Sequence, residues 1–146
     1  MSSSQDKQSK WDSVRRYKLN KMINKLGNIS GHGTELVTVY IPPRKPIYDI
    51  VSQLRNEAGT ASNIKSDLTR NHVQDALSRT IEHLKLYKEP PENGLVIFCG
   101  AIPTGKGIGT EKIEIYSVVP PKPIQINLYR CDDHFWIDHL KDMMKD

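Results

Sequence analysis

"GTASNIKSD", residues 59–67, separates two segments in which apolar residues recur with helical spacing. The stretch between these segments is short, small and polar, as expected of a turn rather than of a third element. We therefore predict two amphipathic helices joined as a protruding α-helical hairpin. The two apolar stripes consist of Ile47, Ile50, Val51, Leu54 and Ala58 before the turn, and Val73, Ala76, Leu77, Ile81 and Leu84 after it.

The turn itself contains residues that suit the ends of helices. Gly59 is expected to end the first helix, and Ser66 is expected to cap the second with Asp67 in its first turn. Asn63 can hydrogen-bond to the backbone of the turn. Lys65 has no such explanation, because a cation is unfavourable near a helix N-terminus. Lys65 therefore indicates a partner that is anionic or rich in hydrogen-bond acceptors.

Outside the hairpin, four segments have the composition of β-strands: "ELVTVYIPP" (35–43), "GLVIFCGA" (94–101), "EKIEIYSVV" (111–119) and "INLYRC" (126–131). A basic helix is expected from Trp11 to Gly27, and a short helix is expected over residues 132–146. The order α, β, α, α, β, β, β, α predicts an α+β fold with a mostly antiparallel four-stranded sheet and packed helices. We expect a disordered tail over residues 1–9 and one domain over residues 10–146.

Length, charge and cysteine content restrict the class of protein. The chain has 146 residues, a net charge of +4, a sequence pI of about 9.0 and two cysteines. One domain with a core fits this length, and the mild positive charge permits a nucleic-acid partner without requiring one. Two cysteines, a polar N-terminus and the lack of a long apolar run indicate a cytoplasmic protein without a membrane anchor. The basic face of the first helix suits either solvent or a phosphate backbone.

Two local patterns suggest ligand sites and fit them poorly. Gly100, Gly105 and Lys106 match the start of a phosphate-binding loop, but Gly107 replaces the hydroxyl residue that binds magnesium, and a strand follows. Zinc-type ligands occur at Cys99, Cys131, His134 and His139, without paired short spacing. We expect neither a metal nor another cofactor. No catalytic dyad or triad is evident, so we expect no enzymatic activity.

Two motifs together resemble a known family. "GTASNIKS" (59–66) and the pattern Tyr129-x-Cys131-x-x-x-Phe135 are similar to the N-terminal domain of the class-one translation termination factor shared by archaea and eukaryotes. The flanks "GTELVTVYIPP", "NGLVIFCG" and "INLYRC" also resemble this family, and the similarity runs from about Trp11 to Asp146. Glu35 is typical of the archaeal branch, because eukaryotic relatives typically have serine there. This departure leaves the contribution of the "GTE" loop (33–35) open.

The resemblance implies stop-codon recognition in the decoding centre of the small ribosomal subunit, on a codon of U followed by two purines. By motif, residues 63–66 would address the first base, Glu57 and Tyr129 the purines with Cys131 beside them, and Thr34 the last purine. Phe135 would support the pocket from behind. The implied codon-recognition residues are Thr34, Glu57, Thr60, Ser62, Asn63, Ile64, Lys65, Ser66, Tyr129, Cys131 and Phe135. The implied partners are the mRNA stop codon, small-subunit RNA and, for a full-length factor, a translational GTPase.

The residue types suit this chemistry. A lysine ammonium only donates hydrogen bonds, so it favours the acceptor of uracil over the amine of cytosine. A carboxylate accepts from the amine of adenine, and hydroxyls can donate or accept. The Gly-Gly-Gln loop that triggers peptidyl-tRNA hydrolysis in the family does not occur here. We therefore expect a module that binds and selects. The alternatives are a protein-interaction module that uses the hairpin and, less favoured, a nucleotide-binding domain.

Overall fold

The computed structural model describes residues 2–145, with side chains from residue 13 onward, and contains four helices and four strands in the predicted order. The helices are α1 (Ser2–Gly27), α2 (Ile47–Ala61), α3 (Asp67–Leu84) and α4 (Asp138–Met143). The strands are β1 (Leu36–Ile41), β2 (Leu95–Ile102), β3 (Lys112–Val118) and β4 (Leu128–Asp132). The α+β prediction is confirmed.

The four strands form one sheet in the order β3-β2-β1-β4, and each neighbouring pair is antiparallel. The two apolar segments, β1 and β2, lie in the middle and are buried along their whole length. The alternating segment, β3, lies at an edge and is half-buried, which explains its mixed composition. As predicted, β2 and β3 form a hairpin across the glycine-rich loop.

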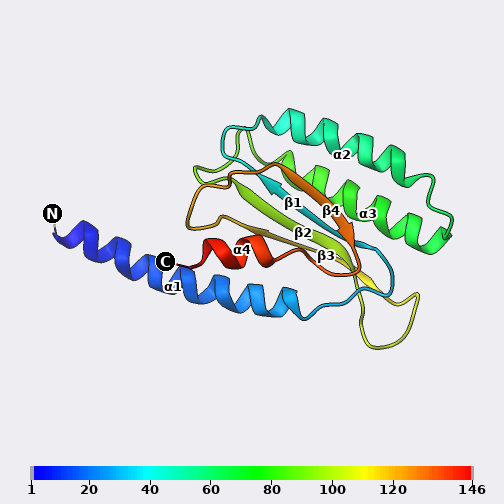
Figure 1. The fold of residues 1–146 in the computed structure, drawn as a ribbon, viewed down its shortest axis with the longest axis horizontal. Coiled ribbons are helices and arrows are strands. Elements are labelled where there is room, and N and C mark those ends of the chain that lie inside the picture. Colours follow the sequence, from blue (N-terminus) through cyan, green and yellow to red (C-terminus); the bar gives the residue numbers. More distant parts are fainter. Residues whose placement is uncertain (1, 146) are drawn as a thin grey trace.

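Helices cover both faces of the sheet (Figure 1). The hairpin of α2 and α3 packs on one face over odd-numbered residues of β1 and β2, such as Val37, Val39 and Ile97. Helices α1 and α4 pack on the other face over Leu36, Tyr40 and other even-numbered residues. Because side chains alternate along a strand, each central strand contributes to both cores.

Several predicted helix boundaries differ from the structure. Helix α2 does not end at Gly59 but continues to Ala61, because Gly59 has no positive φ and Ala61 is buried. Helix α4 begins at Asp138, since residues 133–137 lie along the sheet. There the hydroxyl of Thr38 accepts a hydrogen bond from the backbone N–H of Trp136 at 3.1 Å, and the hydroxyl of Tyr40 donates to the carbonyl of Trp136 at 2.8 Å.

Helix α1 starts at Ser2, earlier than the predicted start at Trp11. The predicted tail over residues 1–9 lies outside the residues whose side chains the structure describes, and its disorder stays a prediction. Farther along, Leu19, Ile23 and Leu26 are buried against the sheet, and α1 ends at Gly27 as expected.

Candidate functional site

Four connections meet at one end of the sheet, which we call the tip end (Figure 1). They are the loop 28–35, the turn 62–66 of the helical hairpin, the loop 103–111 between β2 and β3, and the segment 133–137. The strand register explains the meeting, because Leu36 at the start of β1 pairs with Gly100 near the end of β2 and with Asp132 at the end of β4. The predicted site residues all lie at or near this end.

The hairpin turn is closed by its own backbone. The N–H groups of Ser62, Asn63 and Ile64 donate to the carbonyls of Gly59, Thr60 and Ala61 at 3.2, 3.1 and 3.0 Å. The hydroxyl of Ser66 accepts from the N–H of Thr69 at 3.2 Å, which confirms the predicted N-cap of α3. The turn therefore has a defined backbone conformation.

Arg70, which lies on α3, stabilises the hairpin turn. Its guanidinium donates to the carbonyl of Ile64 at 3.0 Å and to the carboxylate of Asp67 at 2.7 Å. Charge-assisted bonds of this kind are stronger than neutral ones. Sequence reasoning missed Arg70, although its spacing of three residues from Asp67 is typical of a helical ion pair. As a result, Asp67 has a cationic partner other than Lys65.

Side chains of the turn point in two directions. Ile64 is partly buried and packs against the core beneath the hairpin. Asn63 and Lys65 are exposed, and neither side chain has a hydrogen bond or ion pair to another side chain or backbone group within residues 13–145. The expected bond from the Asn63 side chain to the turn backbone is therefore not formed. Asn63 and Lys65 together offer an unused amide and an unused ammonium group at the tip end.

Thr60 and Ser62 are exposed, and their hydroxyls point back to the chain. The hydroxyl of Thr60 donates to the carbonyl of Asn56 at 3.2 Å, and that of Ser62 donates to the carbonyl of Gly59. These bonds to preceding carbonyls stabilise the end of α2. Thr60 and Ser62 therefore support the turn, and their oxygen lone pairs stay available as acceptors.

On β4, Tyr129 and Cys131 point toward the helical hairpin and are half-buried against the same core. The thiol of Cys131 donates to the carbonyl of Thr34 at 3.2 Å. Burial raises the pKa of Cys131 from 9.0 to about 11, so the group is a neutral thiol at pH 7. Burial also raises the pKa of Tyr129, and the nearby Cys131 and Glu57 raise it further. The Tyr129 hydroxyl therefore stays protonated and can both donate and accept.

Thr34 is exposed, whereas the next residue, Glu35, is only 2% exposed. This loop lies directly on β2, since a Cβ at Gly100 would be 2.5 Å from the carbonyl oxygen of Glu35. Glycine at position 100 permits this close approach. The loop thus presents the Thr34 side chain outward and holds Glu35 inside.

Glu35 and His72 form an unexpected contact inside the tip end. The Nδ1 of His72, on α3, lies 3.0 Å from Oε1 of Glu35, although the two atoms are not aligned as a hydrogen bond. The Nε2 of His72 lies 3.9 Å from Oε1 of Glu111, which also contacts His32. These four groups were not predicted, because no spacing in the sequence relates them. Glu35 is therefore an internal group rather than a surface carboxylate.

Phe135 lies on the opposite face of the sheet from Tyr129 and Cys131. It is 1% exposed and packs edge-on against Phe98 with ring centroids 5.5 Å apart. A side chain buried in this way supports the segment after β4 and cannot touch a ligand at the surface. A supporting role from behind is consistent with this position.

The residues considered as zinc ligands are not brought together. Cys99 is buried beneath the helical hairpin, where burial raises its pKa to about 11, while His139 packs against Trp136 on the other face. Between Ser13 and Lys145, the one group of potential ligands within mutual reach is Asp132, Asp133 and His134. It is exposed or partly exposed, and such acidic groups are common on protein surfaces.

The glycine-rich loop is followed by strand β3, not by a helix. A phosphate-binding loop of nucleotide-binding proteins requires a helix N-terminus at this point. The glycine-rich loop of this protein therefore lacks the helix that a nucleotide-binding loop requires.

A comparison with known protein families gives a match over most of the chain. A family model described as "eRF1 domain 1" matches residues 14–145, nearly the whole chain. The chain belongs to the eRF1 domain 1 family. It is 47% identical over 129 residues to peptide chain release factor subunit 1 of Methanosphaera stadtmanae, which covers 88% of this chain and 31% of that protein.

Other relatives give the same result. The chain is 45% identical over 135 residues to peptide chain release factor subunit 1 of Methanocaldococcus jannaschii, covering 92% of this chain and 32% of that protein. Its fold is similar to a crystal structure of the archaeal translation termination factor aRF1, with a TM-score of 0.80, 37% identity, and coverage of 90% of this chain and 35% of that one. The chain thus spans about a third of the length of the relatives it matches. The matched third is domain 1, so peptidyl-tRNA hydrolysis is not assigned to these residues.

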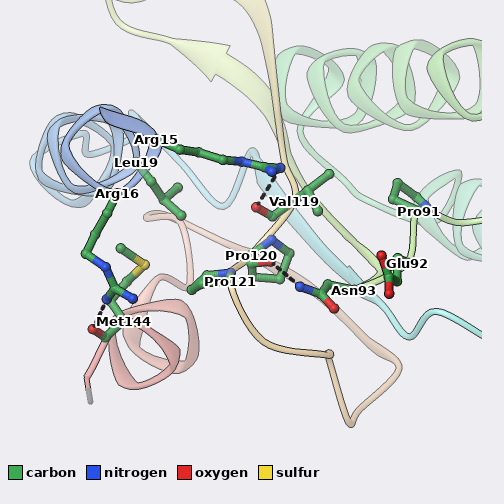
Figure 2. A pocket seen from close by; sticks show the side chains of 10 residues that line it. All are labelled: Arg15, Arg16, Leu19, Pro91, Glu92, Asn93, Val119, Pro120, Pro121 and Met144. Carbon is green, nitrogen blue, oxygen red and sulfur yellow. Dashed lines mark hydrogen bonds between the residues drawn. The ribbon is translucent and has the colours of Figure 1, made fainter. Parts of the chain in front are cut away.

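This eRF1 domain 1 has a cavity of about 580 Å³ lined by residues before the start of β2 and after the end of β3, at the end of the sheet opposite the tip end. The cavity lies between α1, the 91–93 turn and the 119–121 segment. Arg15 reaches the carbonyl of Val119 at 3.5 Å, and Arg16 donates to the carbonyl of Met144 at 2.8 Å (Figure 2). These contacts tie α1 to the ends of β3 and α4, so the cavity's arginines have a structural role. None of the predicted codon residues lines this cavity.

No helix in the described part of this eRF1 domain 1 is long and apolar enough to cross a membrane.

Proposed function

We propose that this domain recognises stop codons in the decoding centre during translation termination, as a cytoplasmic module of a longer release factor. The observation that carries the proposal is the tip of the hairpin, where Asn63 and Lys65 are exposed on a turn held by the backbone hydrogen bonds of residues 62–64 and by the Ser66 cap. Proteins read RNA best where bases are unpaired and their edges are accessible. A rigid tip with two unused polar side chains suits such a target.

The first base is assigned to Lys65 with Asn63. An ammonium group donates only, so it pairs with the O4 acceptor of uracil and meets the amine of cytosine unfavourably. Ser66 and Ile64 position this pair rather than read the base, since Ser66 caps α3 and Ile64 packs against the core. One good base contact contributes about 1–3 kcal/mol of discrimination.

The two purines are assigned to Glu57, Tyr129 and Thr34. The carboxylate of Glu57 can accept from the amine of adenine, while the protonated hydroxyl of Tyr129 can also donate to the carbonyl of guanine. The thiol of Cys131 is engaged with the carbonyl of Thr34, so it orients the Thr34 loop beside these groups. The partners are the mRNA stop codon and small-subunit RNA, with a translational GTPase acting on the full-length factor.

The test places this domain in the Methanosphaera relative, in place of the matching segment. Peptide release is measured on ribosomes programmed with UAA, UAG, UGA, the tryptophan codon UGG and CAA, which differs from UAA in the first base, for the wild type, Lys65→Ala and Tyr129→Phe. Lys88→Ala is the control, because Lys88 is exposed and follows the end of α3 that is remote from the turn 62–66. We expect a codon-dependent loss of release with ribosome binding retained, and no change for the control.

Unchanged codon dependence in both variants would contradict the proposal. The hairpin would then be a capped turn that binds an acidic protein partner without reading the codon. The 146-residue chain alone is expected to release no peptide on stop-programmed ribosomes.

A further inference from the structure

The glycine-rich loop between β2 and β3, residues 103–110, has no role in the proposed function. It lies at the tip end, on the same side of the molecule as the helical hairpin turn (Figure 1). Gly105, Gly107 and Gly109 have φ angles of +83°, +110° and +97°, while no other residue type in the described chain has a positive φ. The sign of φ therefore alternates over five consecutive residues, 105–109.

The loop is held in place by Glu111, directly before β3. Its Oε1 accepts from the N–H of Gly109 at 2.8 Å, and its Oε2 contacts Nδ1 of His32. The side chain of Glu111 has no exposed surface, and the hydrogen bond with His32 lowers its pKa. Thr104 and Thr110 also bond across the mouth of the loop at 2.8 Å. The loop is thus fixed to the segment that carries Thr34.

The outer side of the loop is cationic. Lys106 is exposed, and its ammonium group forms no ion pair with any residue from 13 to 145. The N–H groups of Gly107 and Ile108 have no acceptor in that same part of the chain. Glu111, the nearest carboxylate in the sequence, points inward to His32. Consecutive N–H groups in a backbone of alternating φ form a concave site for anions.

We propose that this loop is a second RNA contact of the domain, which binds a backbone phosphate of ribosomal RNA beside the decoding site through Lys106 and the N–H groups of Gly107 and Ile108. The inference rests on the proposed function, because that function brings the tip end to ribosomal RNA. A lysine and backbone N–H groups contact phosphates without reading bases. The strand after the loop and the missing hydroxyl residue at position 107 disfavour a free nucleotide.

The open space around the loop supports a close approach by a large ligand. No heavy atom lies within 4 Å of a Cβ built on Gly105, Gly107 or Gly109, so these glycines are not required for internal packing. Ile108 is 73% exposed, which leaves its apolar side chain available to a sugar or base. The exposed surface therefore combines a cation, two donors and an apolar group on one loop.

The test measures the binding of the chimeric full-length factor to stop-programmed ribosomes as a function of salt. Lys106→Ala should weaken binding on the order of fivefold and lower the slope of log K against log salt by about 0.7–0.9, the value for one phosphate contact. The loss should be equal for UAA, UAG and UGA, because a phosphate contact carries no sequence information. Lys88→Ala, at the opposite end, should change neither quantity.

Each of the following results would overturn the inference. An unchanged affinity and slope would overturn the inference, and so would a loss that depends on the codon. Loss of the Lys106 effect on an mRNA that ends directly after the codon would place the contact on mRNA and overturn the assignment to ribosomal RNA. Competition by millimolar ATP would indicate a nucleotide site and overturn it as well.

The failure of this inference is distinguishable from failure of the proposed function. A codon-dependent effect of Lys65→Ala without any effect of Lys106→Ala would contradict only the loop contact. A codon-independent effect of Lys106→Ala with no codon dependence for Lys65→Ala would support the loop contact and contradict codon reading by the hairpin.

Discussion

The hairpin turn and the glycine loop each present an exposed lysine at the tip end, but they hold it in different ways. Lys65 lies on a turn between two long helices, closed by Ser66 and Arg70. Lys106 lies on a loop whose shape depends on three glycines and on one anchor, Glu111. Reading a base edge requires a fixed direction, whereas a phosphate contact tolerates variation. The difference suggests base reading at Lys65 and backbone binding at Lys106.

Charge reversal should separate the two lysines most strongly. Lys65→Glu is expected to reduce release on the three stop codons on the order of 100-fold, because it removes a donor and places an anion against RNA. Lys106→Glu should reduce ribosome binding by less and equally on every codon. Release rates and binding affinities of the chimeric factor check this prediction. Losses of the same size in both variants would remove the distinction between the two loops.

Alkaline pH should lower the free energy of unfolding of the domain. Burial raises the pKa values of Cys99 and Cys131 from 9.0 to about 11. Between pH 9 and 11 the unfolded chain has lost these protons while the folded chain retains them. The free energy of unfolding should therefore fall with pH, by about 1.4 kcal/mol per unit for each cysteine. The stabilisation is complete below pH 9 and is lost as the pH rises through 11.

Urea unfolding of the chain under reducing conditions, at pH values from 8 to 10.5, measures this slope. Cys99→Ala is the control, since it removes one of the two titrating thiols. Its slope should be smaller by about 1.4 kcal/mol per pH unit. An identical slope in the variant would show that other groups cause the alkaline loss.

Removing the helix cap should loosen the turn but not the glycine loop. Ser66→Ala is expected to lower the free energy of unfolding by about 1 kcal/mol, since the N–H of Thr69 loses its acceptor. Ser66→Asp should restore most of this loss, because aspartate also caps helices. Thermal or urea unfolding checks both variants. If Ser66→Ala is as stable as the wild type, the cap does not hold the turn.

Two glycine substitutions should have opposite signs. Gly59 lies inside α2 without a positive φ and with open space around it, so Gly59→Ala should stabilise the fold by about 0.5–1 kcal/mol. Gly107 has a φ of +110°, so Gly107→Ala should destabilise it by about 1 kcal/mol through backbone strain. Urea unfolding measures both. Stabilisation by Gly107→Ala would mean that the loop does not have the described backbone.

Local patterns predicted most of the fold. The apolar periodicity indicated the order of the elements, the buried strands and the helical hairpin, and Ser66 is the expected cap. Two helix boundaries were predicted wrongly, because tertiary packing determines them. Burial of Ala61 accompanies the extension of α2 past Gly59, and hydrogen bonds between Trp136 and β1 keep residues 133–137 out of α4. Propensity alone does not include such tertiary contacts.

The candidate site was predictable in part. Motif similarity indicated the turn 59–66 and Tyr129-x-Cys131, and the structure places both at or near one end of the sheet with Thr34. The contacts among Glu35, His72, His32 and Glu111 were not predictable, because they join residues far apart in the chain. The burial of Glu35 likewise depends on the close approach of its loop to Gly100.

The most direct test of codon reading compares two codons that differ only in the first base. Release by the chimeric factor is measured on UAA and on CAA, for the wild type and for Lys65→Ala. The account predicts a high ratio of UAA to CAA release in the wild type, and a ratio lower by about tenfold or more in Lys65→Ala, since the ammonium group distinguishes an acceptor from a donor. An unchanged ratio in the variant would contradict the assignment of the first base to this hairpin.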